Sequence, residues 1–288
     1  MAESNKTSEI ITQPEGTYWH FLADDRCLRY GDKRKVVVGE TLRVDGIPIL
    51  CDRGLHASEQ VIDALSFAPG STACLVTLGG VVLHDMEHVV PNKSVGQERK
   101  VLWMYDASSL LRNFACDVAE EALLSERKAG REPDPRSFDA ISVMRRFIVG
   151  NATETERFAA EKSAWSSANS AGKNLTKNAA HRVANSASKS AAQSAAESAA
   201  WSLAQSAARG AAYSAAWSAG WNAAECASEC MARNMTESMA ENMSDIKARY
   251  AAWKGAESMA KSIFNDQLTR ILLAAMARGE GDFPSSNA

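Results

Sequence analysis

Residues 58–84, SEQVIDALSFAPGSTACLVTLGGVVLH, decide the fold class of the first half of the chain. Ser58 is a typical residue to begin a helix, and the apolar residues that follow have helical spacing: Val61, Ile62, Leu65 and Ala68. Pro69-Gly70 ends this helix. The β-branched and apolar residues beyond it predict two strands, one on each side of Gly79-Gly80. The stretch therefore indicates a domain that mixes helix and sheet.

The flanking sequence extends this α+β pattern in both directions. Strands are predicted at TYWHFL (17–22), RKVVVGETLRV (34–44) and RKVLWMYD (99–106), because these runs are rich in β-branched and aromatic residues. IPILCDRGLHAS (47–58) predicts a short strand that runs into a turn, and ASSLLRNFACDVAEEALLSER (107–127) predicts a closing amphipathic helix. We therefore expect an α+β head domain over residues 17–127, preceded by a disordered lead-in over residues 1–16.

The composition changes after the head. KAGREPDPRS (128–137) combines charge, glycine and two prolines, which is typical of a linker. No proline follows Pro135 until Pro284, and alanine, the residue with the highest helix propensity, dominates that interval. The sequence therefore predicts an all-α, Ala/Ser-rich repeat domain over residues 138–278 and a disordered tail over residues 279–288.

A four-residue repeat runs through the second half from Ser166 to Asn242. One position is mainly Ser or Asn, two are mostly small, and the fourth carries the large side chains. On an α-helix each position drifts about 40° per repeat, so close-packed helices must either coil around one another in the right-handed sense or break, with glycines as the weak points. A basic stretch (162–209) and an acidic stretch (225–245) favour an antiparallel fold-back, with head-to-tail association between chains as the alternative.

Four aromatic residues occupy the large position of this repeat and are the candidate binding residues: Trp201, Tyr213, Trp217 and Trp221. Trp and Tyr are common anchors of protein interfaces, so one interpretation of these residues is a contact site for a protein partner. The other interpretation, which the sequence favours, is that these rings pack between the helices and fill a core that alanine leaves small.

Charge and hydropathy limit the other partners. The formal net charge is −3 at pH 7, which does not point to nucleic acid or to an anionic membrane surface. The first residues lack a signal-peptide pattern, and no apolar run approaches the roughly 20 residues of a membrane helix, so a cytoplasmic location is expected. The six cysteines are scattered, which predicts buried free thiols rather than disulfides or metal ligands: Cys27, Cys51, Cys74, Cys116, Cys226 and Cys230.

The head holds four histidines and no obvious catalytic motif. The spacing of His84 and His88 would suit zinc on a helix, but the local pattern is a strand followed by a loop. No phosphate-binding loop, nucleophile elbow or carboxylate pair is present. No metal and no cofactor are therefore expected.

CDRGLHASEQVIDALSFAPGSTACLVTLGGVV (51–82) resembles an uncharacterised phage and prophage protein family. Its members carry a Cys-x-x-Gly-Phe/Leu-His-Ala-Cys/Ser motif, which is matched here by residues 51–58, followed by variable low-complexity repeats. AISVMRRFIVGNATETERFAAEKSAW (140–165) also resembles the start of their Ala-rich helical domains, and that of some toxin-immunity proteins. The resemblance implies a phage or prophage origin and work against host defences. Together with a repeat that can serve as a recognition surface, it leads us to expect a non-enzymatic accessory protein of the host cytoplasm that binds a host or phage protein.

The head also resembles ADP-ribosyltransferases of the poly-ADP-ribose polymerase type. That resemblance implies NAD as cofactor, His20 in YWHFL as the residue that holds the NAD ribose, and Glu98 in QERKVLWMYD as the residue that orients it and supports the transition state by charge. His56 in GLHAS stands where that family has a tyrosine that stacks on nicotinamide.

A third alternative is a homo-oligomer in which the basic and acidic stretches pair between chains.

Overall fold

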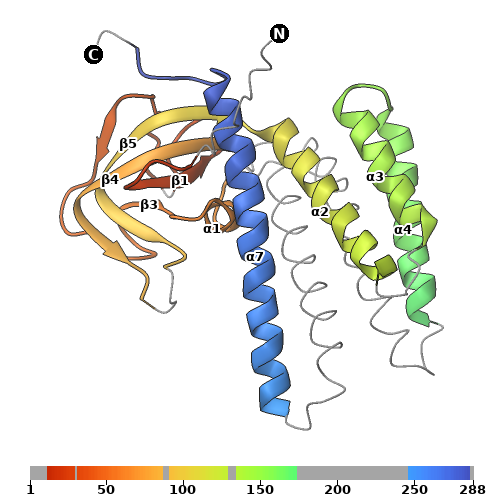
Figure 1. Ribbon diagram of the computed structural model, residues 1–288. Helices are drawn as coiled ribbons and strands as arrows, with labels where there is room; N and C mark the ends of the chain where they lie inside the picture. Colours follow the sequence, from red (N-terminus) through yellow and green to blue (C-terminus); the bar gives the residue numbers. More distant parts are fainter. Residues whose placement is uncertain (1–11, 30, 87–90, 129–133, 174–245, 286–288) are drawn as a thin grey trace, which may run out of the picture.

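The head is built on an antiparallel β-sheet whose strands are neighbours in the order β1-β4-β5-β2, with β3 also paired to β5. This computed structural model describes residues 12–29, 31–86, 91–128, 134–173 and 246–285. The strands are β1 (Thr17–Leu22), β2 (Thr41–Arg43), β3 (Leu55–Ala57), β4 (Thr72–His84) and β5 (Ser94–Asp106). β4 and β5 are the long central pair, and the three shorter strands line their outer edges (Figure 1).

One backbone bridge closes this sheet into a barrel. Trp19 on β1 and Ser58, which follows β3, exchange both backbone hydrogen bonds, at 2.7 and 2.9 Å. Because β3 also pairs with β5, the strands form the closed circuit β1-β4-β5-β3-β1, with β2 on β5 beyond β3. Successive residues of a strand face opposite sides, so each strand has one face inside the barrel and one outside.

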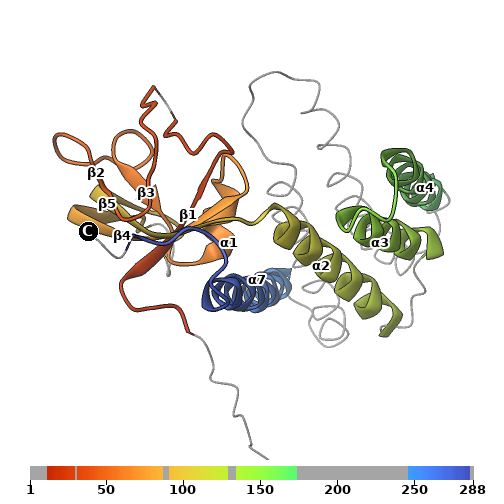
Figure 2. The same cartoon turned by 90° about the horizontal axis from the view of Figure 1, so that it is seen from above.

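Five helices are described: α1 (Val61–Ser66), α2 (Ser108–Lys128), α3 (Pro135–Ile148), α4 (Glu154–Lys173) and α7 (Ile246–Ala277). Seen from above, α7 lies beside α1 at the barrel, and α2, α3 and α4 lie progressively farther from the barrel (Figure 2). Asp134 caps α3 by accepting the backbone N–H of Arg136, and Thr153 and Glu156 form a reciprocal cap at the start of α4.

The apolar residues form two main cores. The helix-side core lies between the outer face of the barrel and the helices, and it includes Trp19, Leu75 and Trp103 from the strands. The barrel interior is a separate cluster that includes Leu22, Val76 and Val101. The same strands supply both cores, because successive side chains point to opposite faces of the sheet. Phe21 and Leu75 therefore enter the helix-side core, while their neighbours Leu22 and Val76 enter the barrel interior.

Helix α7 returns the chain to the head. Phe264, Leu268 and Leu272 are fully buried in the helix-side core together with residues of α1, α2 and the sheet. Residues 279–285, which the sequence predicts to be disordered, instead follow the barrel: Asp282 exchanges backbone hydrogen bonds with Met104 of β5, at 2.7 and 3.1 Å. Residues 264–282 and the head therefore form one packed unit.

The structure confirms the α+β class of the head and corrects several of its strands. The prediction of two strands around Gly79-Gly80 is wrong, because β4 is continuous and its irregular register between Gly79 and Val82 marks a bulge. Only Thr41–Arg43 of the strand predicted over residues 34–44 is formed. In residues 47–58 the turn comes before the strand, with Ile49 bridged to Arg53 ahead of β3.

The helical half is described only in part. The predicted helices at residues 61–68 and 107–127 correspond to α1 and α2, and α3 begins at Pro135, inside the predicted linker. Residues 174–245, and with them most of the repeat, lie outside the described residues. None of the described helices is both long enough and apolar enough to span a membrane.

Candidate functional site in the barrel interior

Three polar residues on the strand faces that line the barrel interior make up the candidate site: His20 on β1, which is half-buried, and the buried Cys74 on β4 and Arg99 on β5. His20 and Cys74 are cross-strand partners, and Arg99 pairs with Leu78 on β4 and with Leu42 on β2. Directly opposed residues share one face of a sheet, so these side chains enter the interior from neighbouring strands.

Arg99 is the central charge of this site. It is 2% exposed, and its Nη1–H donates to the backbone carbonyl of His56 at 2.8 Å. Its Nε and Nη2 are buried and have no hydrogen-bond partner among the described residues. Burial lowers the pKa of Arg99 to about 10, so the guanidinium still carries its charge at neutral pH.

The two histidines near Arg99 are neutral at neutral pH. Burial holds the pKa of His20 well below its usual value, and the Arg99 guanidinium and the His56 ring lower it further. Burial is also the main cause that lowers the pKa of His56, followed by the charges of Arg99 and Lys93. Neither ring therefore adds a positive charge to the one that Arg99 already places in the interior.

His56, the middle residue of β3, holds the preceding loop in place with its ring. Its Nε2 accepts the backbone N–H of Cys51 at 3.1 Å, and its ring also hydrogen-bonds to the backbone of Gly54. Leu55 and Ala57, on either side of it, are buried in the barrel interior. The Cys-x-x-Gly-Leu-His-Ala-Ser motif thus holds the loop before β3 in place, and its last residue, Ser58, closes the barrel on Trp19.

Cys74 is not an activated nucleophile. The thiol is fully buried, and burial raises its pKa to about 12, although the charges of Arg99 and Arg26 act in the opposite direction. A thiol with such a pKa stays protonated at neutral pH. The prediction of buried free thiols is confirmed for Cys74 and Cys116, whereas Cys51 is exposed and Cys27 is half-buried.

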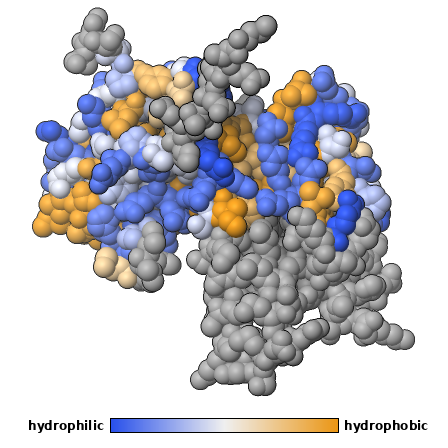
Figure 3. All heavy atoms as spheres, in the orientation of Figure 1, coloured by the Kyte–Doolittle hydropathy of each residue, from blue (hydrophilic) through white to orange (hydrophobic). Residues whose placement is uncertain are grey.

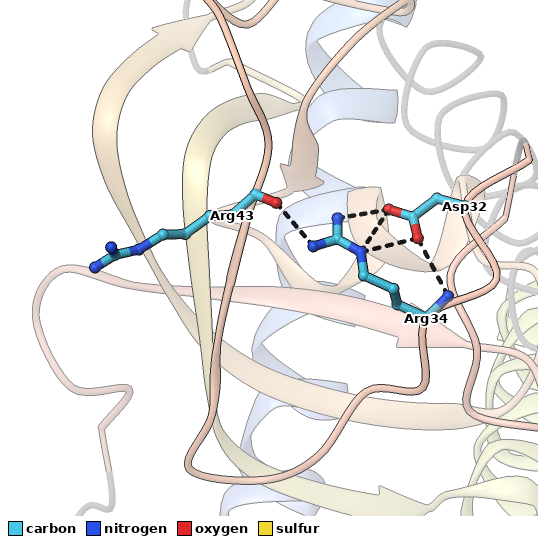
Figure 4. Close-up of polar contacts among 3 residues, drawn as sticks. All are labelled: Asp32, Arg34 and Arg43. Atoms are coloured by element: carbon cyan, nitrogen blue, oxygen red, sulfur yellow. Dashed lines mark hydrogen bonds and ion pairs between the residues drawn. The ribbon is translucent and has the colours of Figure 1, made fainter.

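An arginine–carboxylate pair lies near the site. Arg34 holds Asp32 with Nε and Nη2, at 3.0 and 2.6 Å, and its Nη1 donates to the backbone carbonyl of Arg43 at the outer edge of β2 (Figure 4). The Arg34 guanidinium keeps the pKa of Asp32 below its usual range. Asp32 acts on Arg99 through its charge, while its own hydrogen bonds go to Arg34.

The structure separates the three residues that the ADP-ribosyltransferase resemblance brings together. His20 and His56 are close to each other, since a hydrogen bond links the His20 ring to the His56 backbone. Glu98 precedes Arg99 on β5 without a bulge between them, so its side chain leaves the opposite face of the strand. There it forms an ion pair with Arg43 at 3.1 Å and is 34% exposed.

The other predicted site residues are not described. Trp201, Tyr213, Trp217 and Trp221 lie outside the described residues, as do Cys226 and Cys230. His88 is also outside them, and His84 makes a 2.8 Å hydrogen bond to Ser94 through Nδ1. Within the described ranges no group of three or more His, Cys, Asp or Glu side chains could hold a metal ion.

The surface of the barrel adds apolar residues but no defined site. Figure 3 shows apolar side chains gathered at the edge of the barrel that lies away from α2. The exposed large apolar residues of the head include Ile47, Ile49, Val81, Leu83 and Met86. Exposed apolar side chains are common on folded proteins, so they do not by themselves indicate an interface.

Comparisons of the chain with protein-family models, with curated proteins and with solved structures gave no match. The functional interpretation therefore depends on the chemistry of the residues. Arg99, which the sequence analysis did not select, is the main charged group of the interior. Its signal in the sequence is weak: a charged residue that shares its strand face with the apolar Val101.

Proposed function

We propose that the chain is a non-enzymatic, phage-type accessory protein that binds a host or phage protein through its repeat and so inhibits a host defence. One observation carries this proposal. The end of α4 and the beginning of α7, between which residues 174–245 run, lie at the same end of the molecule (Figure 1). Both ends of residues 174–245 therefore join the described part of the chain on the same side.

The packing of the helices supports a head that works as a platform. α2 packs on α3 and α3 on α4, while α7 contacts both α1 and α2. The last turns of α7 are fixed by buried leucines, and Arg145 of α3 pairs with Asp117 and Glu120 of α2, at 2.8 and 2.7 Å. A segment held at both ends loses less conformational entropy when it binds than a segment held at one end.

Site-specific photo-crosslinking tests this proposal. The crosslinker replaces Trp217 in one full-length variant and Val149, an exposed residue at the end of α3, in a matched control. In lysate of the host, we expect the Trp217 position to capture one protein that the Val149 position does not. Capture should fall when the other three aromatic residues, Trp201, Tyr213 and Trp221, are changed to Ala.

Two outcomes would contradict the proposal. The same proteins captured from both positions would mean that the repeat does not select a partner. Capture that is unchanged in the triple alanine variant would remove the aromatic residues as anchors. The melting temperature of every variant is measured alongside capture, so that a loss of capture is separated from a loss of folding.

The enzymatic alternative has less support from the geometry. An NAD-dependent ADP-ribosyltransferase would need His20, His56 and Glu98 around one bound nucleotide, and Glu98 leaves the face of β5 opposite to Arg99. The homo-oligomer alternative depends on charged residues of which most lie in residues 174–245, outside the described residues. It predicts a mass that rises with concentration in light scattering, and reversal of charge at Lys173, Lys177 and Lys189 should abolish that rise.

A further inference from the structure

The two unpartnered nitrogens of Arg99 form one binding edge. In a guanidinium, the Nε–H and one Nη2–H point in the same direction and form a fork that matches the two oxygens of a carboxylate or phosphate. In Arg99 these are the two nitrogens without a hydrogen-bond partner among the described residues, while Nη1 holds the His56 carbonyl. The whole fork, rather than an isolated N–H, is therefore unpaired.

The same edge takes a carboxylate elsewhere in this chain. Three other arginines use Nε and Nη2 together, with distances from 2.6 to 3.2 Å. These pairs are Arg34 with Asp32, Arg136 with Asp134, and Arg157 with Glu154. In each of them the acid lies two or three residues away in the sequence. Arg99 differs from these three arginines. The acid next to it, Glu98, faces the other side of the strand and pairs with Arg43, and the residue after it is Lys100.

The surroundings of Arg99 favour an anion. The nearby histidines are neutral, Cys74 is a protonated thiol, and Asp32 has its oxygens on Arg34. Buried polar groups of native proteins are nearly always paired, and buried charges are paired or bind a ligand. A buried guanidinium with a free fork in an otherwise uncharged interior fits an oxyanion better than it fits a purely structural role.

We propose that the barrel interior binds the oxyanion group, a carboxylate or a phosphate, of a small molecule through the Nε–H and Nη2–H of Arg99. The two nitrogens are enclosed, so the ligand enters only when side chains of the interior cluster move aside. Leu28 and Val36 are members of that cluster and come from the segment between β1 and β2, which is not part of a strand. This inference is independent of the partner proposed for the repeat.

Arginine Nε–Hε resonances in a ¹H–¹⁵N spectrum of the full chain test the inference. The probes are sodium phosphate and sodium acetate, each compared with sodium chloride at matched ionic strength. We expect one Nε–Hε resonance to shift in a saturable manner with at least one probe and to be absent from Arg99→Lys. A shift with acetate alone identifies a carboxylate ligand, and a shift with phosphate alone identifies a phosphate ligand.

A stability measurement provides the second readout. The effective anion should raise the melting temperature of the wild type and of Arg43→Lys, an exposed control, and should leave that of Arg99→Lys unchanged, because lysine keeps the charge but loses the fork. The inference is overturned if neither anion moves an Nε–Hε resonance of the wild type. It is also overturned if the resonance that moves persists in Arg99→Lys.

Discussion

The Nη1–H of Arg99 on β5 donates to the backbone carbonyl of His56 on β3 at 2.8 Å, which links two strands through the inside of the barrel. This hydrogen bond lies close to the place where the barrel closes, because His56 is two residues before Ser58, which is bridged to Trp19. It satisfies one nitrogen of a buried cation and leaves two without a partner among the described residues. Arg99 therefore costs stability in the absence of a ligand, and this cost can be measured.

Replacement of Arg99 by Met should stabilise the ligand-free protein. Methionine matches the stem of arginine and removes the two unpartnered nitrogens and a buried charge, together with the one hydrogen bond to the His56 carbonyl. We expect the first effect to be the larger and the free energy of unfolding to rise by about 1 to 3 kcal/mol. Arg145→Met is the matched control, because Arg145 has two carboxylate partners and is partly exposed. That variant should lose about 0.5 to 1 kcal/mol. Denaturant unfolding of both variants checks the difference, and a larger loss in Arg99→Met than in Arg145→Met would show that Arg99 is stabilising.

His56 should matter for stability more than Cys51 does, although both belong to the same motif. His56→Ala removes the acceptor of the Cys51 N–H and the contact with the Gly54 backbone, so we expect a loss of about 1 to 3 kcal/mol. Cys51→Ser keeps the backbone hydrogen bond of an exposed residue and should stay within about 0.5 kcal/mol of the wild type. Equal losses in the two variants, measured by denaturant unfolding, would contradict the role assigned to the His56 ring.

Alanine substitutions at two glycines with positive φ distinguish a steric clash from the cost of an unfavourable backbone conformation. Gly54 has φ +133°, and an added Cβ would clash with Cγ2 of the fully buried Val95. Gly31 has φ +90° and nothing within 4 Å of an added Cβ. Gly31→Ala should therefore cost about 1 to 2 kcal/mol from the backbone alone, and Gly54→Ala should cost more than about 3 kcal/mol. Similar melting temperatures for the two variants would mean that Val95 moves away at little cost.

Acidification should destabilise the head through its histidines. His20 has a lowered pKa in the folded protein, so between pH 6.5 and that value the unfolded chain binds a proton that the folded chain does not. The free energy of unfolding then falls as the pH falls, by about 1.4 kcal/mol per pH unit for each such group. His56 contributes in the same direction.

A His20→Gln variant isolates the share of His20, since glutamine can keep a hydrogen bond to the His56 backbone and does not titrate. The groups that face His20 are Arg99, His56 and Cys74. Arg99 keeps its charge and Cys74 stays neutral in this range, and the lowered pKa of His56 acts in the same direction as that of His20. The lowered pKa of carboxyls such as Asp32 acts at lower pH. Unfolding measured from pH 7 to pH 5 should show a smaller slope in His20→Gln than in the wild type. An unchanged slope would place the titration elsewhere.

The sequence predicts best the elements whose pattern is local. α1 and α2 follow from the helical spacing of their apolar residues, and β1 follows from a single β-rich run. Gly79-Gly80 has the composition of a hairpin turn, but the pair lies in a bulge of β4, where Gly80 adopts φ +67° with the Gln97 side chain beside it. Whether the two glycines form a turn or a bulge depends on how β4 pairs with β5. That pairing involves residues distant in the sequence, so the local sequence pattern does not predict it.

The candidate site could not be predicted for the same reason. Glu98 and Arg99 are adjacent charged residues, and which of them faces inward depends on which face the barrel encloses. That is decided by the bridge between Trp19 and Ser58, which are far apart in the sequence. The contacts of Asp282 with Met104 and of Trp103 Nε1 with the Glu280 carbonyl span still longer distances and turn a predicted disordered tail into a part of the head.

Transfer of label from NAD into protein tests the central claim, that the chain binds a partner and does not modify one. The assay uses host lysate with the wild type, His20→Ala and Glu98→Ala, and an active ADP-ribosyltransferase as positive control. We expect the wild type to incorporate no more label than either variant. Incorporation by the wild type that is lost in both variants would contradict the account and would show that the head is an enzyme.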